Sequence, residues 1–139
     1  MIAIIIAEAH PEITKIIALC PPSDLMTSAH KWKNQSPRIS TRDLPGDSTK
    51  QITFEIPYAY IKDATQYSAI ESVSQITQPL MILIALADTT VDPALTEQII
   101  THAHNPYVIK VSNLGHNFRK SNQKTLTVMS EIENFLNKF

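Results

Sequence analysis

Two ionisable side chains follow apolar segments of this sequence and are its candidates for chemistry. Asp88 is the first charge after the apolar run Leu80–Leu86, and His116 lies in the loop that follows Tyr107–Val111. Such a run, bounded by turn signals, is typical of a strand buried on both faces of a parallel sheet. Open α/β sheets bind their ligands beyond the carboxyl ends of these strands. We therefore expect Asp88 and His116 to face each other at this edge, where a histidine titrating near neutral pH suits proton transfer.

Other residues compete for a functional interpretation, and the two candidates also fit structural roles. An aspartate at a strand end often caps a turn or helix, and a lone loop histidine is often solvated. His102 and His104 could suggest a metal site, but their spacing of two on a helix points them apart. We therefore expect no metal and no cofactor. Cys20 is expected to be a buried small hydrophobe rather than a nucleophile.

The elements that position the candidate pair are expected in the order helix, strand, hairpin arm, strand, helix, strand, helix. Residues 1–10 are apolar on every side and favour a buried helix, although isoleucine also allows a strand. The remaining expected ranges are strand 13–20, loop or short helix 24–36, hairpin strands 39–41 and 52–56 with a turn at 44–47, short helices 57–67 and 68–76, strand 80–86, a helix after 92, strand 107–111 and a final helix after 121. Strands that alternate with helices predict a parallel α/β sheet.

Two of the expected helices carry further signals. Asp92-Pro93 fits a helix N-cap followed by proline at the first helical position. The apolar residues after it mark one face, and the last helix has one apolar stripe. The predicted face comprises Leu95, Ile99 and Ala103, and the predicted stripe comprises Met129, Ile132, Leu136 and Phe139.

Composition limits the class of protein. At 139 residues with a formal net charge of −1, the chain is one domain without a basic stripe, so we expect no nucleic-acid partner. No apolar run is long enough to span a bilayer, and the start lacks the features of a signal peptide, so we expect no membrane partner. The single Cys20 excludes an internal disulfide and fits a reducing compartment, for which we predict the cytoplasm.

A series of segments resembles the α/β-hydrolases. ILIALADTTVDP resembles the strand and turn that end in their triad acid, and NLGHNF resembles the loop that carries their histidine. ITKIIALCPPSDL resembles the strand before their lid region. The segment 38–67 resembles the hairpin and short helices that follow. The resemblance covers the whole chain, as one domain at 1–139 with a lid-like insertion at 24–78, but only the carboxyl-terminal half of the family's domain.

The resemblance implies a partial α/β-hydrolase fold, with three mainly parallel strands, flanking helices and an inserted β-hairpin arm. It also implies roles for the candidate pair. Asp88 would hold the imidazole of His116 in one tautomer, and His116 would act first as general base and then as general acid. Gly115 would let the chain turn tightly beside it.

The nucleophile of that chemistry is absent from this sequence. In the family it lies in a Gly-x-Ser-x-Gly elbow, but the only glycines here are Gly46 and Gly115. The elbow is expected just before Met1, because residues 1–10 resemble the helix that follows it. The family's glycine three residues before the acid is Ala85 here. We therefore expect this chain alone to be inactive.

Three functions remain open at this point. The first is the carboxyl-terminal part of a serine hydrolase, whose full-length form would act by acyl transfer on a small-molecule ester, thioester or amide. The second is a non-catalytic binding or assembly module of the same fold, and the third is a small-molecule-binding α/β domain of another family. In the family's sheet, strand 13–20 is flanked by the strand that leads to the elbow, and that neighbour is missing here. We therefore expect strand 13–20 to form an open sheet edge in the isolated chain and to drive homo-oligomer formation.

Overall fold

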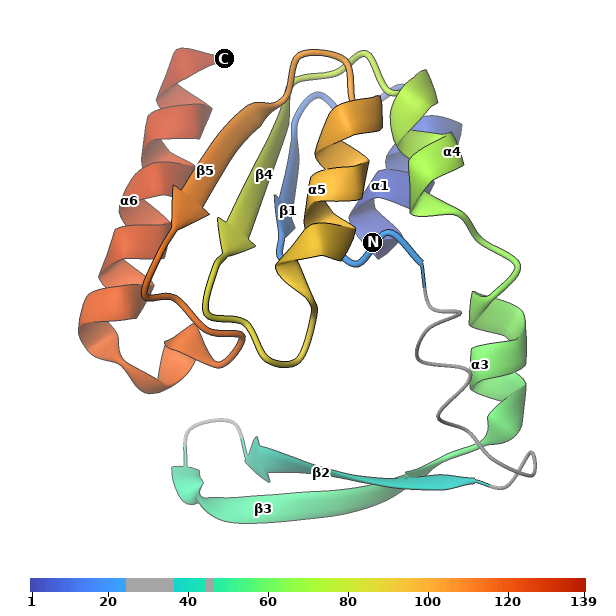
Figure 1. Cartoon of the computed structure of the whole chain (residues 1–139), viewed down its shortest axis with the longest axis vertical. Helices are drawn as coiled ribbons and strands as arrows, with labels where there is room; N and C mark the ends of the chain where they lie inside the picture. Colours follow the sequence, from blue (N-terminus) through green and yellow to red (C-terminus); the bar gives the residue numbers. More distant parts are fainter. Residues whose placement is uncertain (25–36, 45–46) are drawn as a thin grey trace. The chain divides into compact units, whose positions relative to one another are not determined.

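The computed structural model describes residues 1–24, 37–44 and 47–139, which belong to two compact units (Figure 1). Unit 1 comprises Met1–Asp24 and Ser68–Phe139, and unit 2 lies within Leu25–Tyr67. Residues 25–36 of the predicted loop or short helix, and Pro45-Gly46 of the predicted turn, lie outside the described residues. The single-domain boundaries at 1–139 stay a prediction.

A three-stranded parallel sheet forms the centre of unit 1. Its strand order is β1–β4–β5, where β1 is Ile16–Leu19, β4 is Leu80–Ala85 and β5 is Tyr107–Val111. β4 lies in the middle, pairs in parallel with both neighbours, and is buried at every position. This confirms the buried strand predicted from the uncharged run, because a central parallel strand is covered on both faces.

Helices cover both faces of this sheet (Figure 1). On one face lie α1 (Ile2–Ala9), α4 (Ala69–Gln75) and α5 (Pro93–His102), whose core includes Leu80 and Ile82 of β4. On the other face lies α6 (Asn122–Lys138), packed against the alternate β4 residues Met81, Leu83 and Ala85. Alternation of side chains along β4 therefore divides the core into two layers.

Side-chain hydrogen bonds cap the amino termini of two helices. The Asp92 carboxylate accepts the Ala94 backbone N–H at 2.9 Å, and Pro93 begins α5. Ser121 caps α6 by accepting the N–H of Lys124. Residues 2–9 form a helix rather than the alternative strand, and α1 buries Ile4 and Ala7.

The predicted apolar stripe of α6 is wrong in part. Val128 and Phe135 are buried against the sheet with Ile132 packed beside them, whereas Met129, Leu136 and Phe139 are exposed. Apolar residues occupy the consecutive positions 128–129 and 135–136. The helix therefore has two overlapping apolar stripes. The inner one contains Val128, Ile132 and Phe135, and the outer one contains Met129, Ile132 and Leu136. Phe135 occupies the inner stripe, where its ring packs 5.8 Å from that of Tyr107.

The predicted face of α5 also needs correction. Thr96, rather than its neighbour Leu95, is buried with Ile99. Its hydroxyl donates to the carbonyl of Pro21 at 2.9 Å and ties α5 to the segment after β1. A threonine was not an obvious core residue, but a buried hydroxyl is stable where it finds such an acceptor.

Unit 2 contains an antiparallel hairpin, as predicted, with longer strands than expected. β2 is Arg38–Leu44 and β3 is Asp47–Ile56, with Arg38 opposite Ile56 and a register shift at Asp43/Leu44. α3 (Tyr58–Ala64) follows with Pro57 as its N-cap. No helix among the described residues is long and apolar enough to cross a bilayer.

Candidate active site

Asp88 and His116 lie in contact beyond the carboxyl ends of β4 and β5. His116 Nδ1 is 2.8 Å from Asp88 Oδ2. A carboxylate can only accept, so the imidazole donates from Nδ1, and in the neutral ring Nε2 is then the acceptor. The sequence-based prediction that these residues face each other at this edge of the sheet is therefore correct.

The carboxylate of Asp88 is held from both sides. Its side chain is 1% exposed, and its second oxygen, Oδ1, accepts the backbone N–H groups of Thr90 at 2.8 Å and Val91 at 2.9 Å. Hydrogen bonds of this kind fix the carboxylate plane and compensate the loss of hydration of a buried charge. The two N–H donors belong to the turn between β4 and α5.

Backbone hydrogen bonds between two loops bring the pair together. The N–H of Leu86 donates to Val111 O at 3.0 Å, and the N–H of Ala87 donates to Leu114 O at 2.9 Å. The loop after β4 is thereby attached to the loop after β5. Gly115 lies at this joint, where an added Cβ would come 3.3 Å from Ala87 O. Its small size therefore permits the close approach of the two loops.

His116 reaches the surface while its partner does not. The imidazole is 40% exposed, and its Nε2 makes no hydrogen bond to any residue that the structure describes. An imidazole fixed at Nδ1 and accessible at Nε2 can accept a proton from a neighbouring hydroxyl and return it later. This arrangement is suited to general acid–base chemistry at one ring nitrogen.

Ser23, which follows β1 at the carboxyl ends of the strands, takes a structural role. Ser23 is buried, and its hydroxyl donates to Gln98 Oε1 of α5 at 2.7 Å. Asp24 has an interaction partner of its own. Neither residue joins the Asp88–His116 pair in a hydrogen bond.

Cys20 is a neighbour of Asp88 that the sequence did not reveal. It has a φ of 48°, is buried, and lies at the end of β1, where its N–H donates to Leu83 O at 2.8 Å. Burial raises the pKa of its thiol, a backbone hydrogen bond at Ala85 opposes this, and the charge of the adjacent Asp88 raises the pKa further. A protonated thiol is a poor nucleophile, so Cys20 fits the packing role expected for it.

The two histidines at the end of α5 contact backbone carbonyls. His102 Nδ1 donates to Gln98 O within its own helix at 2.8 Å, and His104 Nε2 donates to Ser74 O at 2.8 Å. In the described part of the chain, no group of three or more metal-ligating side chains comes together.

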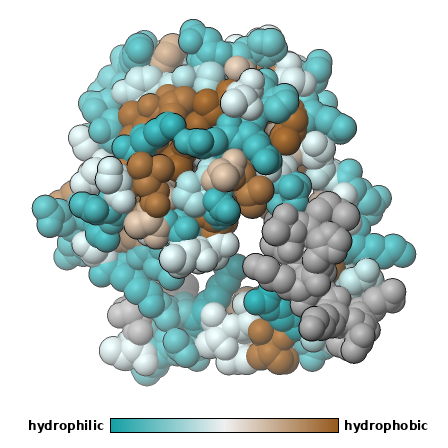
Figure 2. Space-filling view, in the orientation of Figure 1, coloured by the Kyte–Doolittle hydropathy of each residue, from teal (hydrophilic) through white to brown (hydrophobic). Residues whose placement is uncertain are grey.

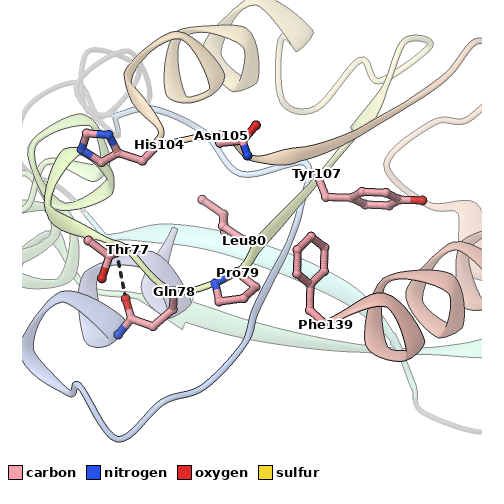
Figure 3. A pocket seen from close by; sticks show the side chains of 8 residues that line it. All are labelled: Thr77, Gln78, Pro79, Leu80, His104, Asn105, Tyr107 and Phe139. Atoms are coloured by element: carbon pink, nitrogen blue, oxygen red, sulfur yellow. Dashed lines mark hydrogen bonds between the residues drawn. The ribbon is translucent and has the colours of Figure 1, made fainter.

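Two hollows in unit 1 lie apart from this pair. The larger, about 460 Å³, lies at the amino ends of β4 and β5 (Figure 3). Asp88 lies at the opposite ends of these strands. The lining of the larger hollow includes Pro79, Leu80, Tyr107 and Phe139. A second, of about 330 Å³, lies between the loop after β5 and α6. Neither is lined by Asp88 or His116.

Comparison with known proteins gives matches in structure alone. No protein-family model matches the sequence, and no curated protein matches it. Alpha/beta hydrolase domain-containing protein 10 from mouse aligns with 97% of this chain at 21% identity and a TM-score of 0.70. Est1E from Butyrivibrio proteoclasticus, solved with ferulic acid bound, aligns with 96% at 14% identity and a TM-score of 0.69. The monoacylglycerol lipase of Paleococcus ferrophilus aligns with 96% at 13% identity and a TM-score of 0.67.

These matches cover only part of the matched proteins. The chain spans 57% of the mouse protein, 53% of Est1E and 63% of the lipase. Its parallel sheet, the helices on both faces and the separate hairpin agree with the partial architecture predicted from the sequence. This chain therefore has the α/β-hydrolase fold, and its partial coverage of the matched structures fits the carboxyl-terminal half of that fold.

Proposed function

We propose that this chain is the carboxyl-terminal part of a serine hydrolase and carries the acid and the base of its catalytic triad. Asp88 is the acid and His116 is the base. The observation that carries the proposal is the 2.8 Å contact between His116 Nδ1 and a buried Asp88 carboxylate whose other oxygen accepts two backbone N–H groups. A triad needs this arrangement because the carboxylate must select one imidazole tautomer.

In this mechanism His116 transfers the proton, and Asp88 supports that transfer. Nε2 of His116 takes the proton of a serine hydroxyl as that oxygen attacks the substrate carbonyl. Asp88 stabilises the imidazolium that results, without itself becoming protonated. Nε2 then gives the proton to the leaving group. In the second half of the reaction, Nε2 takes a proton from the water that attacks the acyl group and returns it to the serine oxygen as the acid is released.

The serine and the oxyanion hole are supplied from outside this sequence. The chain has glycine only at positions 46 and 115, so no serine in it has the flanking glycines of a nucleophile elbow. We propose that a longer form carries the elbow and that its substrate is a small-molecule ester, thioester or amide. The matched esterase and lipase support the ester class. We propose the cytoplasm as its location, since the lone Cys20 fits a reducing compartment, and expect neither nucleic acid nor membrane as partner.

An assay of two forms tests this proposal. The 139-residue chain should hydrolyse p-nitrophenyl acetate no faster than its His116→Ala variant, because it lacks the nucleophile and the oxyanion hole. A form extended by the in-frame coding sequence upstream of Met1 should contain Gly-x-Ser-x-Gly and should turn over the ester. Turnover by the 139-residue chain that disappears in His116→Ala would reveal another nucleophile and contradict the proposal.

A second function is favoured by the missing elbow itself. A non-catalytic binding or assembly module of this fold would keep the Asp88–His116 contact for stability and would need no serine. If the upstream sequence contains no elbow and the extended form is inactive, this alternative replaces the hydrolase.

A further inference from the structure

The hollow at the amino ends of β4 and β5 is built from residues that the proposed catalysis does not use (Figure 3). Its volume of about 460 Å³ lies in the range of small-molecule binding sites. The lining comes from the segment that enters β4, the segment that joins α5 to β5, and the end of α6. None of the lining residues belongs to β1 or α1, so the hollow does not involve the β1 edge of the sheet.

One end of the hollow is built on a cluster of aromatic rings. The rings of Tyr107 and Phe139 lie 6.5 Å apart at 78°, edge to face. Phe135 supports both from the core, with its ring 5.8 Å from that of Tyr107 and 5.3 Å from that of Phe139. Pro79 and Leu80 add apolar wall beside them. Figure 2 shows hydrophobic side chains reaching the surface of the part of the molecule that holds this sheet. Such a wall suits a flat ring, because aromatic pairs favour edge-to-face or offset packing.

The other end of the hollow carries hydrogen-bonding side chains, with Thr77, Gln78 and His104 away from the two rings (Figure 3). Gln78 Oε1 accepts the Thr77 N–H at 3.2 Å, so the Nε2 group of Gln78 remains as a donor. The side-chain amide of Asn105 makes no hydrogen bond within the part of the chain that the structure describes. His104 is held in the wall, because its Nε2 donates to Ser74 O at 2.8 Å. Two amide groups are therefore available to a ligand.

The charged side chain beside the hollow is positive. None of the described side chains that line the hollow is acidic. The Lys138 ammonium lies 5.1 Å from the centre of the Tyr107 ring and 5.4 Å from that of Phe139. It forms no salt bridge with a carboxylate of the described residues. A positive charge together with amide donors favours a ligand that carries an anionic acceptor group.

We propose that this hollow binds a small aromatic carboxylate. The ring of the ligand packs against Tyr107 and Phe139, and its carboxylate accepts hydrogen bonds from the side-chain amides of Gln78 and Asn105. The apolar wall supplies affinity, and the amides together with Lys138 select the carboxylate over an uncharged group. The proposal does not depend on the catalytic one, because the acid–base pair lies at the opposite ends of the same strands.

Titration of the 139-residue chain with 2-naphthoate tests the proposal. Calorimetry should show saturable binding at one site. The ring of the bound ligand should shift the NMR signals of the backbone amides of Gln78, Leu80 and Tyr107 most strongly. The matched compound 2-naphthylmethanol has the same rings and no charge, and it should bind about tenfold more weakly, because hydrogen bonds to charged groups are the stronger ones.

Three variants locate the ligand. Asn105→Gly removes one amide, and glycine adopts the φ of 50° found at this position without strain. It should weaken 2-naphthoate about tenfold and leave 2-naphthylmethanol unchanged. Tyr107→Leu should weaken both compounds, because it removes a ring from the apolar end. Asn113→Ala removes an amide from the second hollow, and as the matched control it should change neither affinity.

Several outcomes would overturn the proposal. One is the absence of saturable binding at millimolar 2-naphthoate, and another is equal affinity for the two compounds. Shifts centred on Val111 and Leu114 would place the ligand in the second hollow instead. Affinity for 2-naphthoate that Asn105→Gly leaves unchanged would also contradict it, and this variant decides the matter even if Tyr107→Leu does not fold.

Discussion

Changing Asp88 to asparagine is expected to lower kcat about 10⁴-fold in an elbow-bearing form of this protein. The asparagine can still accept the N–H groups of Thr90 and Val91, so the turn should keep its shape. Its amide would however donate toward His116 Nδ1, where the carboxylate now accepts at 2.8 Å. The imidazole would then carry its proton on Nε2 and could no longer take the serine proton. Steady-state kinetics on a p-nitrophenyl ester measure this loss.

Two further variants serve as a comparison and a control for Asp88→Asn. His116→Ala should cost about 10⁶-fold in kcat, because the base itself is removed. Asp92→Asn is the matched control: Asp92 is exposed and caps α5, and asparagine caps helices equally well. Its kcat should therefore stay close to that of the unchanged protein. Loss of activity in Asp92→Asn as large as in Asp88→Asn would mean that the turn, and not the carboxylate, matters.

Phe135→Ala is expected to lower the free energy of unfolding by about 3–5 kcal/mol. Phe135 is 0% exposed, packs in the core layer between α6 and the sheet, and lies with its ring 5.3 Å from Phe139. Truncation would remove this packing and leave a cavity under the helix. Urea unfolding, followed by circular dichroism at one fixed protein concentration, gives the difference.

The neighbouring residue on α6 is the control for this prediction. Leu136 is 42% exposed, so Leu136→Ala should cost less than about 1 kcal/mol. The two variants remove side chains one position apart on the same helix and differ chiefly in which face they occupy. A larger loss for Leu136→Ala than for Phe135→Ala would mean that α6 packs by the stripe first predicted from its sequence.

Strong local signals in the sequence predicted much of unit 1. The uncharged run of β4 is typical of a buried central strand, and Asp92-Pro93 marks the start of α5 through a side-chain cap. Both signals depend only on residues that are neighbours in the sequence, so they can be recognised without the tertiary structure. The same is true of the position of Asp88, which follows β4 directly.

Features that depend on contacts between distant segments could not be predicted. The choice between Phe135 and Leu136 as core residue depends on the rotation of α6 against the sheet. Burial of Thr96 depends on the Pro21 carbonyl, 75 positions away. Contact between Cys20 and Asp88 likewise requires the ends of β1 and β4 to be adjacent. In the site, the pairing of His116 with Asp88 was predicted, but the backbone donors that hold the carboxylate were not.

The tautomer of His116 tests the central claim most directly, and it needs no active form of the protein. ¹⁵N NMR of the imidazole ring, at a pH where the ring is neutral, distinguishes a proton on Nδ1 from one on Nε2. We predict Nδ1–H for the unchanged chain and for Asp92→Asn, and a shift toward Nε2–H in Asp88→Asn. A proton on Nε2 in the unchanged chain, or a tautomer that Asp88→Asn leaves as it was, would contradict a triad built on Asp88 and His116.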